Sequence, residues 1–222
     1  MIFTPEEPAM ATATISPSSS KILSASTLLA HRRLAAPPKI WGLDMIAGRF
    51  IALDPDPESG TAALSLLAGL IREVQAAEGY AAWIAGPQRI FFPPDFAAAG
   101  VDLAALPIVR APDATKAARA ADTLLRSGSF ALIVLDGDGQ ALPLALQTRL
   151  AGLAHQHHTG LVCLRAPGET ATRGSLVSLR CTTQKRRTGH DCFSCELRAV
   201  KDKRQTPGWT HQELRHGPDG LC

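Results

Sequence analysis

Residues 54–62, with the sequence DPDPESGTA, have the spacing of a phosphate-binding loop but lack most of its functional groups. The apolar run 49–53 before them predicts a strand, and the apolar period of 62–77 predicts a helix. A phosphate-binding loop in this context reads G-x-x-x-x-G-K-[ST]. On that frame, Pro55 stands for the first glycine, Gly60 is retained, Thr61 replaces the lysine and Ala62 replaces the hydroxyl residue.

These replacements remove the groups that hold a nucleotide. Pro55 has no backbone N–H to donate, and Asp56 and Glu58 place negative charge where phosphates would lie. At 4 Å each carboxylate would oppose a phosphate by about 1 kcal/mol even in water. Two interpretations stay open on these residues alone: an ordinary proline- and glycine-rich turn, or a nucleotide site that has lost its chemistry. We predict no catalytic residue, no ATPase activity and no cofactor.

Cysteine and histidine residues near the C-terminus are the other candidates for site chemistry. Cys192 and Cys195, with Cys181 and His190 nearby, are ligand types that suit zinc. A second closely spaced pair is missing, and residues three apart in a strand point to opposite faces. We therefore predict buried cysteines and no metal site. Residues 155–158, HQHH, are interpreted as a polar helix end rather than a ligand set.

Charge is unevenly distributed along the chain. Residues 1–164 contain 12 Lys/Arg and 14 Asp/Glu, a net of −2, whereas residues 165–222 contain 11 and 6, a net of +5. Two basic runs, residues 185–187 (KRR) and residues 201–204 (KDKR), are expected at adjacent turns or on neighbouring strands. They could form one patch. This patch is either a solvated face or a nucleic-acid contact. The candidate DNA contacts are Lys185, Arg186, Arg187 and Arg204.

Apolar strands alternate with helical patterns from residue 48 onward, which predicts βαβ units and a mostly parallel sheet covered by helices on both faces. Beyond residue 174, three strands joined by polar turns predict a C-terminal antiparallel extension. Trp209 is expected to be a packing residue or an interface residue. The expected strands are 50–53, 80–85, 106–109, 131–135, 161–164, 176–181, 193–200 and 209–215, and the expected helices are 62–77, 95–99, 115–127 and 143–155.

The chain organisation predicts one α/β domain with an N-terminal extension. Residues 1–20 read as a disordered tail, residues 21–47 as an arm outside the core, and residues 48–222 as the core, with antiparallel strands within 175–217. The opening stretch lacks the features of a secretory signal, and no apolar run is long enough to cross a bilayer. Five cysteines, an odd number, make no disulfide framework. We expect a cytoplasmic protein without membrane contact.

The segment from residue 48 to 137 resembles the RecA recombinase core. "GRFIALDPDPESGTAALSL" is similar to the family's strand and phosphate-binding loop without a gap, and "AGVDLAALPIVRAPDATKAARAADTLLRSGSFALIVLD" is similar to the stretch that ends at the Walker B aspartate. The resemblance implies that Asp136 holds the Walker B position. It also implies that Pro87 replaces the catalytic glutamate. Loss at both positions favours a nucleotide site dismantled on a retained scaffold.

The ending "CELRAVKDKRQTPGWTHQELRHGPDGLC" resembles that of RecA-like ImuA proteins, a family of inducible mutagenesis, so that the likeness covers about residues 40–222. It implies a RecA-like fold and a role in the SOS mutasome, which carries out translesion DNA synthesis. The partners implied are RecA, the Y-family-like protein ImuB and an error-prone polymerase subunit. Within "AVKDK", Lys201 and Lys203 match two RecA lysines that reach a neighbour's ATP across the filament interface.

Three functional hypotheses follow. The first is a non-catalytic RecA-like accessory protein of the SOS mutasome that contacts RecA, ImuB or both. The second is a sequence-nonspecific DNA-binding repair protein that acts through the C-terminal basic patch on single-stranded DNA. The third is a surviving nucleotide-binding enzyme. The helix expected soon after Asp136 and the short segment 165–175, RAPGETATRGS, leave little room for RecA-type DNA loops. Self-association is compatible with all three.

Overall fold

A computed structural model of the chain describes residues 41–137, 142–165 and 176–217. The described residues belong to one compact unit. The expectations for the tail 1–20, for residues 21–40 of the arm and for residues 166–175 of the RAPGETATRGS segment lie outside the described residues.

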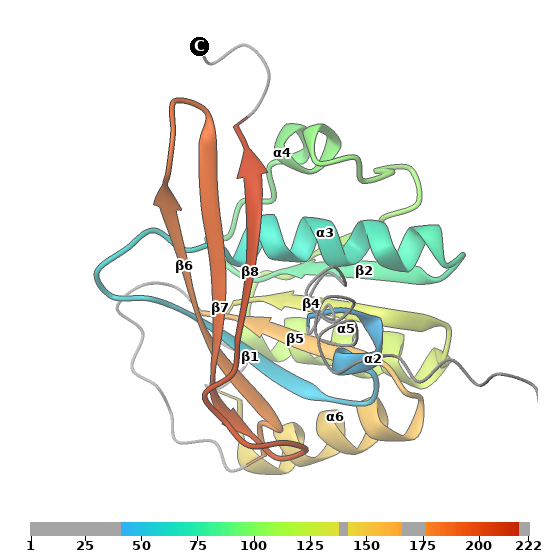
Figure 1. Cartoon of the computed structure of the whole chain (residues 1–222). Helices are drawn as coiled ribbons and strands as arrows, with labels where there is room; N and C mark the ends of the chain where they lie inside the picture. The colour runs from blue at the N-terminus through green and yellow to red at the C-terminus, as the bar shows by residue number, and fades with distance from the viewer. Residues whose placement is uncertain (1–40, 138–141, 166–175, 218–222) are drawn as a thin grey trace, which may run out of the picture. The chain divides into compact units, whose positions relative to one another are not determined.

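The described unit is an α/β fold built on one eight-stranded sheet of order β3-β2-β4-β5-β1-β6-β7-β8 (Figure 1). The strands from β3 to β6 are parallel, and β7 and β8 continue the sheet antiparallel. The strands are β1 Phe50–Pro55, β2 Tyr80–Ala85, β3 Ile108–Arg110, β4 Phe130–Asp136, β5 Gly160–Leu164, β6 Leu179–Arg187, β7 Cys192–Asp202 and β8 Thr210–His216. The helices are α2 Leu43–Ile46, α3 Ala63–Ala76, α4 Pro93–Ala98, α5 Ala114–Ser127 and α6 Leu144–Gln156.

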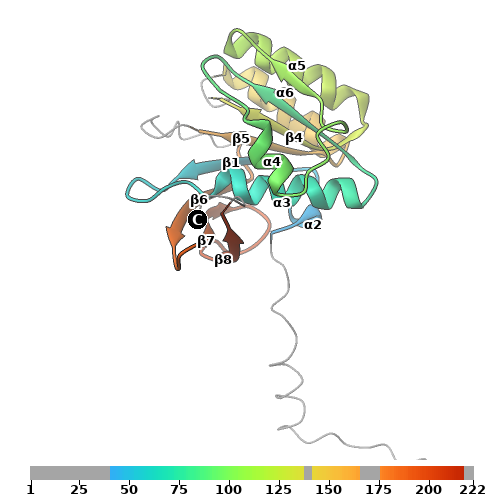
Figure 2. The same cartoon turned by 90° about the horizontal axis from the view of Figure 1, so that it is seen from above.

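Helices cover both faces of the parallel part of the sheet, as the sequence predicts. Figure 2 shows α5 and α6 on one side and α3 on the other. Within β1, Ile51 and Leu53 pack in the core layer that contains α3, whereas Phe50 and Ala52 pack in the layer that contains α5 and α6. A strand buried on both faces must be apolar at every position, which is why the run around 50–53 shows no polar alternation.

The two long helices follow directly from local sequence. In α3, Leu66, Leu70 and Val74 recur at helical spacing and are fully buried. In α5, the Asp113 side chain accepts a hydrogen bond of 2.7 Å from the Lys116 backbone N–H, which caps the first turn. Gly128 ends this helix with a φ of 66°, a left-handed conformation that favours glycine.

The strand β6 differs from the sequence prediction. We expected it at 176–181, followed by a polar turn that contains residues 186–191, yet it extends to Arg187 and pairs parallel with β1. Its residues alternate between buried and half-exposed up to Gln184, because one face of the strand packs in the core while the other is open. Polar residues on an open strand face look like a turn in sequence, so the strand was predicted too short. The antiparallel part of the sheet therefore begins only between β6 and β7.

The core also begins earlier than expected. The sequence placed residues 21–47 outside the core, but Trp41 and Ile46 are fully buried in it. A Cβ at Gly160 would lie 2.7 Å from the Ile46 Cδ1 atom, so the glycine at the start of β5 allows α2 to pack closely there. The short helix α2 is thus a part of the folded unit.

Candidate functional site

The loop between β1 and α3 is held closed by its own aspartate. Asp56 Oδ1 accepts hydrogen bonds from the Glu58 backbone N–H at 3.0 Å, the Ser59 backbone N–H at 3.1 Å and the Ser59 hydroxyl at 3.0 Å. Backbone N–H groups at this point of a phosphate-binding loop would surround a phosphate. Here a carboxylate of the chain takes that place, and these hydrogen bonds hold the pKa of Asp56 below its ordinary value.

The rest of the loop lies against β6 instead of curving over the start of α3. The Asp56 N–H donates to the Thr183 carbonyl at 2.9 Å, and the Gly60 carbonyl accepts from the Lys185 N–H. Gly60 and Lys185 form an antiparallel bridge. One backbone contact with β6 therefore lies on each side of the Asp56 turn, and the two together hold the loop against the C-terminal half of β6.

Thr61 and Ala62 have structural partners of their own. The Thr61 hydroxyl lies 2.9 Å from the Thr183 hydroxyl and accepts a hydrogen bond of 3.2 Å from the Ala63 N–H, a local turn directly before α3. Ala62 is fully buried, so its methyl group fills core space where a hydroxyl would need a partner. Pro55, at the end of β1, is half-buried.

Asp136 ends β4 at the same edge of the sheet, where the Walker B resemblance places it. Its carboxylate is nearly buried and lies 3.7 Å from Arg89 Nε. Its carbonyl accepts a hydrogen bond of 2.7 Å from the Gly86 N–H at the end of β2. Pro87, which follows Gly86 in the sequence, is exposed. The carboxylate at the Walker B position of the resemblance is therefore within ion-pair distance of a guanidinium.

An acidic residue that sequence reasoning missed organises the same edge. Asp54, the fifth residue of β1, receives Arg165 Nε at 2.6 Å and lies 3.8 Å from Arg180 Nε. The Asp54 and Arg165 side chains are each only 8% exposed. A charged residue directly after the apolar run 49–53 was the sequence signal for this site. The partners of Asp54 could not be recognised from the sequence, because they lie 111 and 126 residues away. Buried charges of this kind need partners, and here the partners join β1, β5 and β6.

The two basic runs, 185–187 and 201–204, do not form the single patch that the sequence left open. Because β6 and β7 are antiparallel, Arg187 lies opposite Phe193 near the hairpin turn, whereas Lys201 lies opposite Arg180 at the far end of β6. Seven residues of strand separate these ends by roughly 23 Å. The first run, Lys185, Arg186 and Arg187, therefore lies beside the Asp56 loop. The second run, Lys201, Lys203 and Arg204, lies at the other end of β6 and β7.

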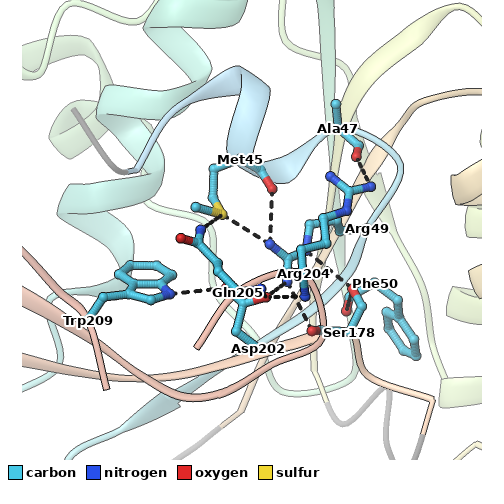
Figure 3. A network of polar contacts seen from close by, with 9 residues as sticks. All are labelled: Met45, Ala47, Arg49, Phe50, Ser178, Asp202, Arg204, Gln205 and Trp209. Carbon is cyan, nitrogen blue, oxygen red and sulfur yellow. Dashed lines mark hydrogen bonds and ion pairs between the residues drawn. The ribbon is translucent and has the colours of Figure 1, made fainter. Parts of the chain in front are cut away.

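A buried ion pair organises the edge that carries Lys201 and Lys203 (Figure 3). Arg49 and Asp202 meet at 2.5 Å, with side chains 1% and 0% exposed. Asp202 also accepts hydrogen bonds from the Arg204 N–H at 2.8 Å and from Trp209 Nε1 at 3.0 Å. Arg49 in turn donates to the Ser178 carbonyl at 3.0 Å. Burial works against the Asp202 charge, but the hydrogen bonds and Arg49 outweigh it and hold the pKa of Asp202 below its ordinary value.

This network positions the turn that follows β7. Lys203 N–H donates to the Ser178 carbonyl at 2.9 Å, and Arg204 donates to the Ala47 carbonyl at 2.9 Å. The Trp209 ring packs against the core, in agreement with its prediction as a packing residue. Next to the network lies an open crevice of about 750 Å³, lined in part by Arg49, Arg204 and Glu73. Sequence reasoning missed Arg49, which looks like the start of a strand.

The cysteines are distributed through the C-terminal sheet rather than gathered. Cys181 and Cys195 are buried in the core, whereas Cys192 is half-exposed. Burial raises the pKa of both buried thiols. In the part of the chain that the structure describes, no group of three Cys, His, Asp or Glu residues is arranged to hold a metal ion. Residues 155–158 end α6 and begin the turn after it, as expected.

Comparison of the sequence with models of known protein families and with curated proteins yields no significant match. Among the helices in the described ranges, none combines the length and apolar character that crossing a bilayer requires.

Proposed function

We propose that this protein is a non-catalytic, RecA-like accessory protein of the SOS mutasome that supports error-prone translesion DNA synthesis through contacts with RecA, ImuB or both. The family assignment rests on the sequence resemblance over residues 40–222. The non-catalytic part rests on one structural observation: the Asp56 carboxylate accepts hydrogen bonds from the backbone N–H groups of Glu58 and Ser59. A bound phosphate would need these N–H groups as hydrogen-bond donors. An incoming nucleotide would have to displace this carboxylate and overcome its charge.

The positions of the two conspicuous surfaces support a head-to-tail contact. The Asp56 loop follows the carboxyl end of β1, and Lys201 lies opposite Arg180 near the amino end of β6. Because β1 and β6 are parallel, these surfaces lie at opposite ends of the sheet, about 17 Å apart along β6. A head-to-tail contact uses two different surfaces of each subunit. A subunit with the lysines but without a nucleotide site could bind at one end of a RecA filament and stop its growth.

The first test measures the ATPase rate of RecA on single-stranded DNA with and without this protein. We expect a changed RecA rate and no ATP hydrolysis by this protein alone. Hydrolysis in that control would refute the non-catalytic assignment. An unchanged RecA rate would exclude the filament-end contact and leave ImuB and the polymerase subunit as partners to test by pull-down.

A matched pair of variants tests the interface. We expect Lys201→Ala with Lys203→Ala to weaken RecA capture, whereas Lys116→Ala with Arg119→Ala on α5 should leave it unchanged. Lys116, Arg119 and Lys203 are exposed and Lys201 is half-buried. Equal capture by both double variants would remove Lys201 and Lys203 from the interface.

A further inference from the structure

The three C-terminal strands have an open face that no described helix covers. Side chains of β6, β7 and β8 alternate between the face towards α3 and the opposite face. Cys181, Leu197 and Ala199 point towards α3 and are buried in the core that contains it. The residues of the opposite face are half-exposed or exposed, apart from Ser194, which is buried, and α6 packs mainly on α5, β1 and β5. The described residues of this open face are Arg180, Thr182, Gln184, Arg186, Cys192, Ser194, Glu196, Arg198, Lys201, Thr210, Gln212, Leu214 and His216.

A β-bulge at Val200 puts Lys201 on this open face. The register pairs Cys181 with Ala199 but Arg180 with Lys201, so Val200 is the extra residue of β7. Without the bulge, Lys201 would point to the same side as Ala199, into the core. With the bulge, Lys201 lies beside Arg180 on the open face, and Asp202 turns inward to Arg49. The buried ion pair therefore keeps the bulge in place.

Positive charge dominates the open face. Arg198 lies opposite Thr182, one pair along from Lys201 and Arg180, and Arg186 continues the row towards the hairpin turn. From Arg180 to Arg186 this row is about 20 Å long. Two acidic residues oppose this charge among the described residues: Glu196 on the face itself, which accepts a hydrogen bond of 2.8 Å from Gln184, and Asp54 of β1, which lies 3.8 Å from Arg180. Burial, Lys203 and Arg180 together lower the pKa of Lys201, so like charges are crowded at this end.

We propose that the open face of β6, β7 and β8 binds the phosphate backbone of a nucleic acid through Arg186, Arg198 and Lys201, beside Arg180, which is paired with Asp54. A row of arginine and lysine with hydroxyl and amide groups beside it is the chemistry that contacts phosphate and sugar. The described positions of this face carry no Phe, Tyr or Trp, because Phe193 points to the other side, where its ring packs under Lys185. Bases therefore have only the His216 ring at the end of β8 to stack on, so binding is independent of sequence and driven by counterion release.

This surface is separate from the one that our proposed function assigns to RecA, except at Lys201. It also differs from the patch expected from the sequence, because Arg180 and Arg198 were not in that patch, and Lys185 belongs to the other face. An acidic protein is the competing partner for such a surface, and the experiment below distinguishes it from a nucleic acid.

The experiment measures binding of the full-length protein to a fluorescent 20-nucleotide oligo-dT and to a 20-base-pair duplex over a series of salt concentrations. The test variant is Arg198→Glu with Lys201→Glu. The control is Lys116→Glu with Arg119→Glu on α5, which makes the same change in net charge. We expect the test variant to lose most of the affinity and the control to lose little. The slope of log K against log salt should fall by about 1.4 for two lost contacts to a single strand.

Equal weakening by the two variants, or no binding of either probe by the unmodified protein, would overturn the proposal. Polyglutamate that competes as well as oligo-dT at equal charge would also overturn it, because the surface would then accept any polyanion. A readout without mutation guards against misfolding: oligo-dT should protect Lys201 from amine acetylation more than Lys116. Equal acetylation of both lysines, with and without DNA, would contradict the assignment. RecA is absent throughout, so failure here leaves the adaptor proposal standing.

Discussion

Arg49 and Asp202 are 153 residues apart in the sequence and form a buried ion pair that joins the start of β1 to the end of β7. The pair has further partners in the Ser178 carbonyl, the Arg204 N–H and Trp209 Nε1. It therefore fixes the end of β7, where Lys201 and Lys203 stand. Five predictions follow from this pair and from other described contacts.

Removing one member of the pair should destabilise the fold strongly. We expect Arg49→Met to lower the free energy of unfolding by about 3–5 kcal/mol, because it leaves the Asp202 carboxylate buried without its guanidinium. Arg49→Met with Asp202→Leu should cost less than the single variant. Urea denaturation of Arg49→Met, Asp202→Leu, the double variant and the unmodified protein measures this. A double variant as unstable as the sum of the single variants would show that the two residues do not interact.

The pH dependence of stability should reflect the same pair. The pKa of Asp202 is below its ordinary value in the folded protein. The stabilisation is therefore complete above the unfolded-state pKa of about 3.9 and is lost as the pH falls through the lower folded-state pKa. Melting temperatures between pH 3 and pH 7 should fall less steeply at the acid end in Asp202→Asn than in the unmodified protein. Parallel curves would contradict this prediction.

The closed form of the 56–60 loop should depend on the Asp56 carboxylate. We expect Asp56→Ala to speed hydrogen exchange at the Glu58 and Ser59 amides, because their acceptor is removed. Asp56→Asn keeps an acceptor oxygen, so exchange at these two amides should be faster than in the unmodified protein and slower than in Asp56→Ala. Amides in α5 serve as an internal control. Unchanged exchange at Glu58 and Ser59 in Asp56→Ala would show that another group closes the loop.

Two glycines should respond to alanine in opposite ways. A Cβ at Gly86 would lie 2.9 Å from the Asp136 carbonyl oxygen, where β2 and β4 end side by side. We expect Gly86→Ala to destabilise the protein by about 1–3 kcal/mol. Gly152 lies within α6 with nothing within 4 Å of its added Cβ, so Gly152→Ala should stabilise by about 0.5–1 kcal/mol. Thermal denaturation of both variants tests the difference in sign.

The cysteines should react with thiol reagents in an order set by burial. Cys192 is half-exposed, whereas Cys163, Cys181 and Cys195 are buried, and burial raises the pKa of the thiols of Cys181 and Cys195. In a Cys222→Ser background, which leaves these four thiols, we expect one thiol to react in the native protein and three more after unfolding. Mass spectrometry should place the first label on Cys192. A first label on Cys181 or Cys195 would contradict the buried positions.

The sequence by itself determined the α/β alternation, because burial on both faces makes each parallel strand a continuous apolar run and gives each helix an amphipathic period. It also determined that the loop at 54–62 lacks the lysine of a phosphate-binding loop, since this depends only on residue types at fixed spacing. The extent of β6 was not predictable, because a strand with one open face carries polar residues that resemble a turn.

Only the tertiary structure decided which charges meet. Asp54 meets Arg165 and Arg180, and Arg49 meets Asp202, through strand pairings that no local pattern encodes. The antiparallel pairing of β6 with β7 separated the two basic runs that the sequence suggested as one patch. A single extra residue at Val200 then decided which face Lys201 occupies, because side-chain direction in a strand alternates and one inserted residue reverses it.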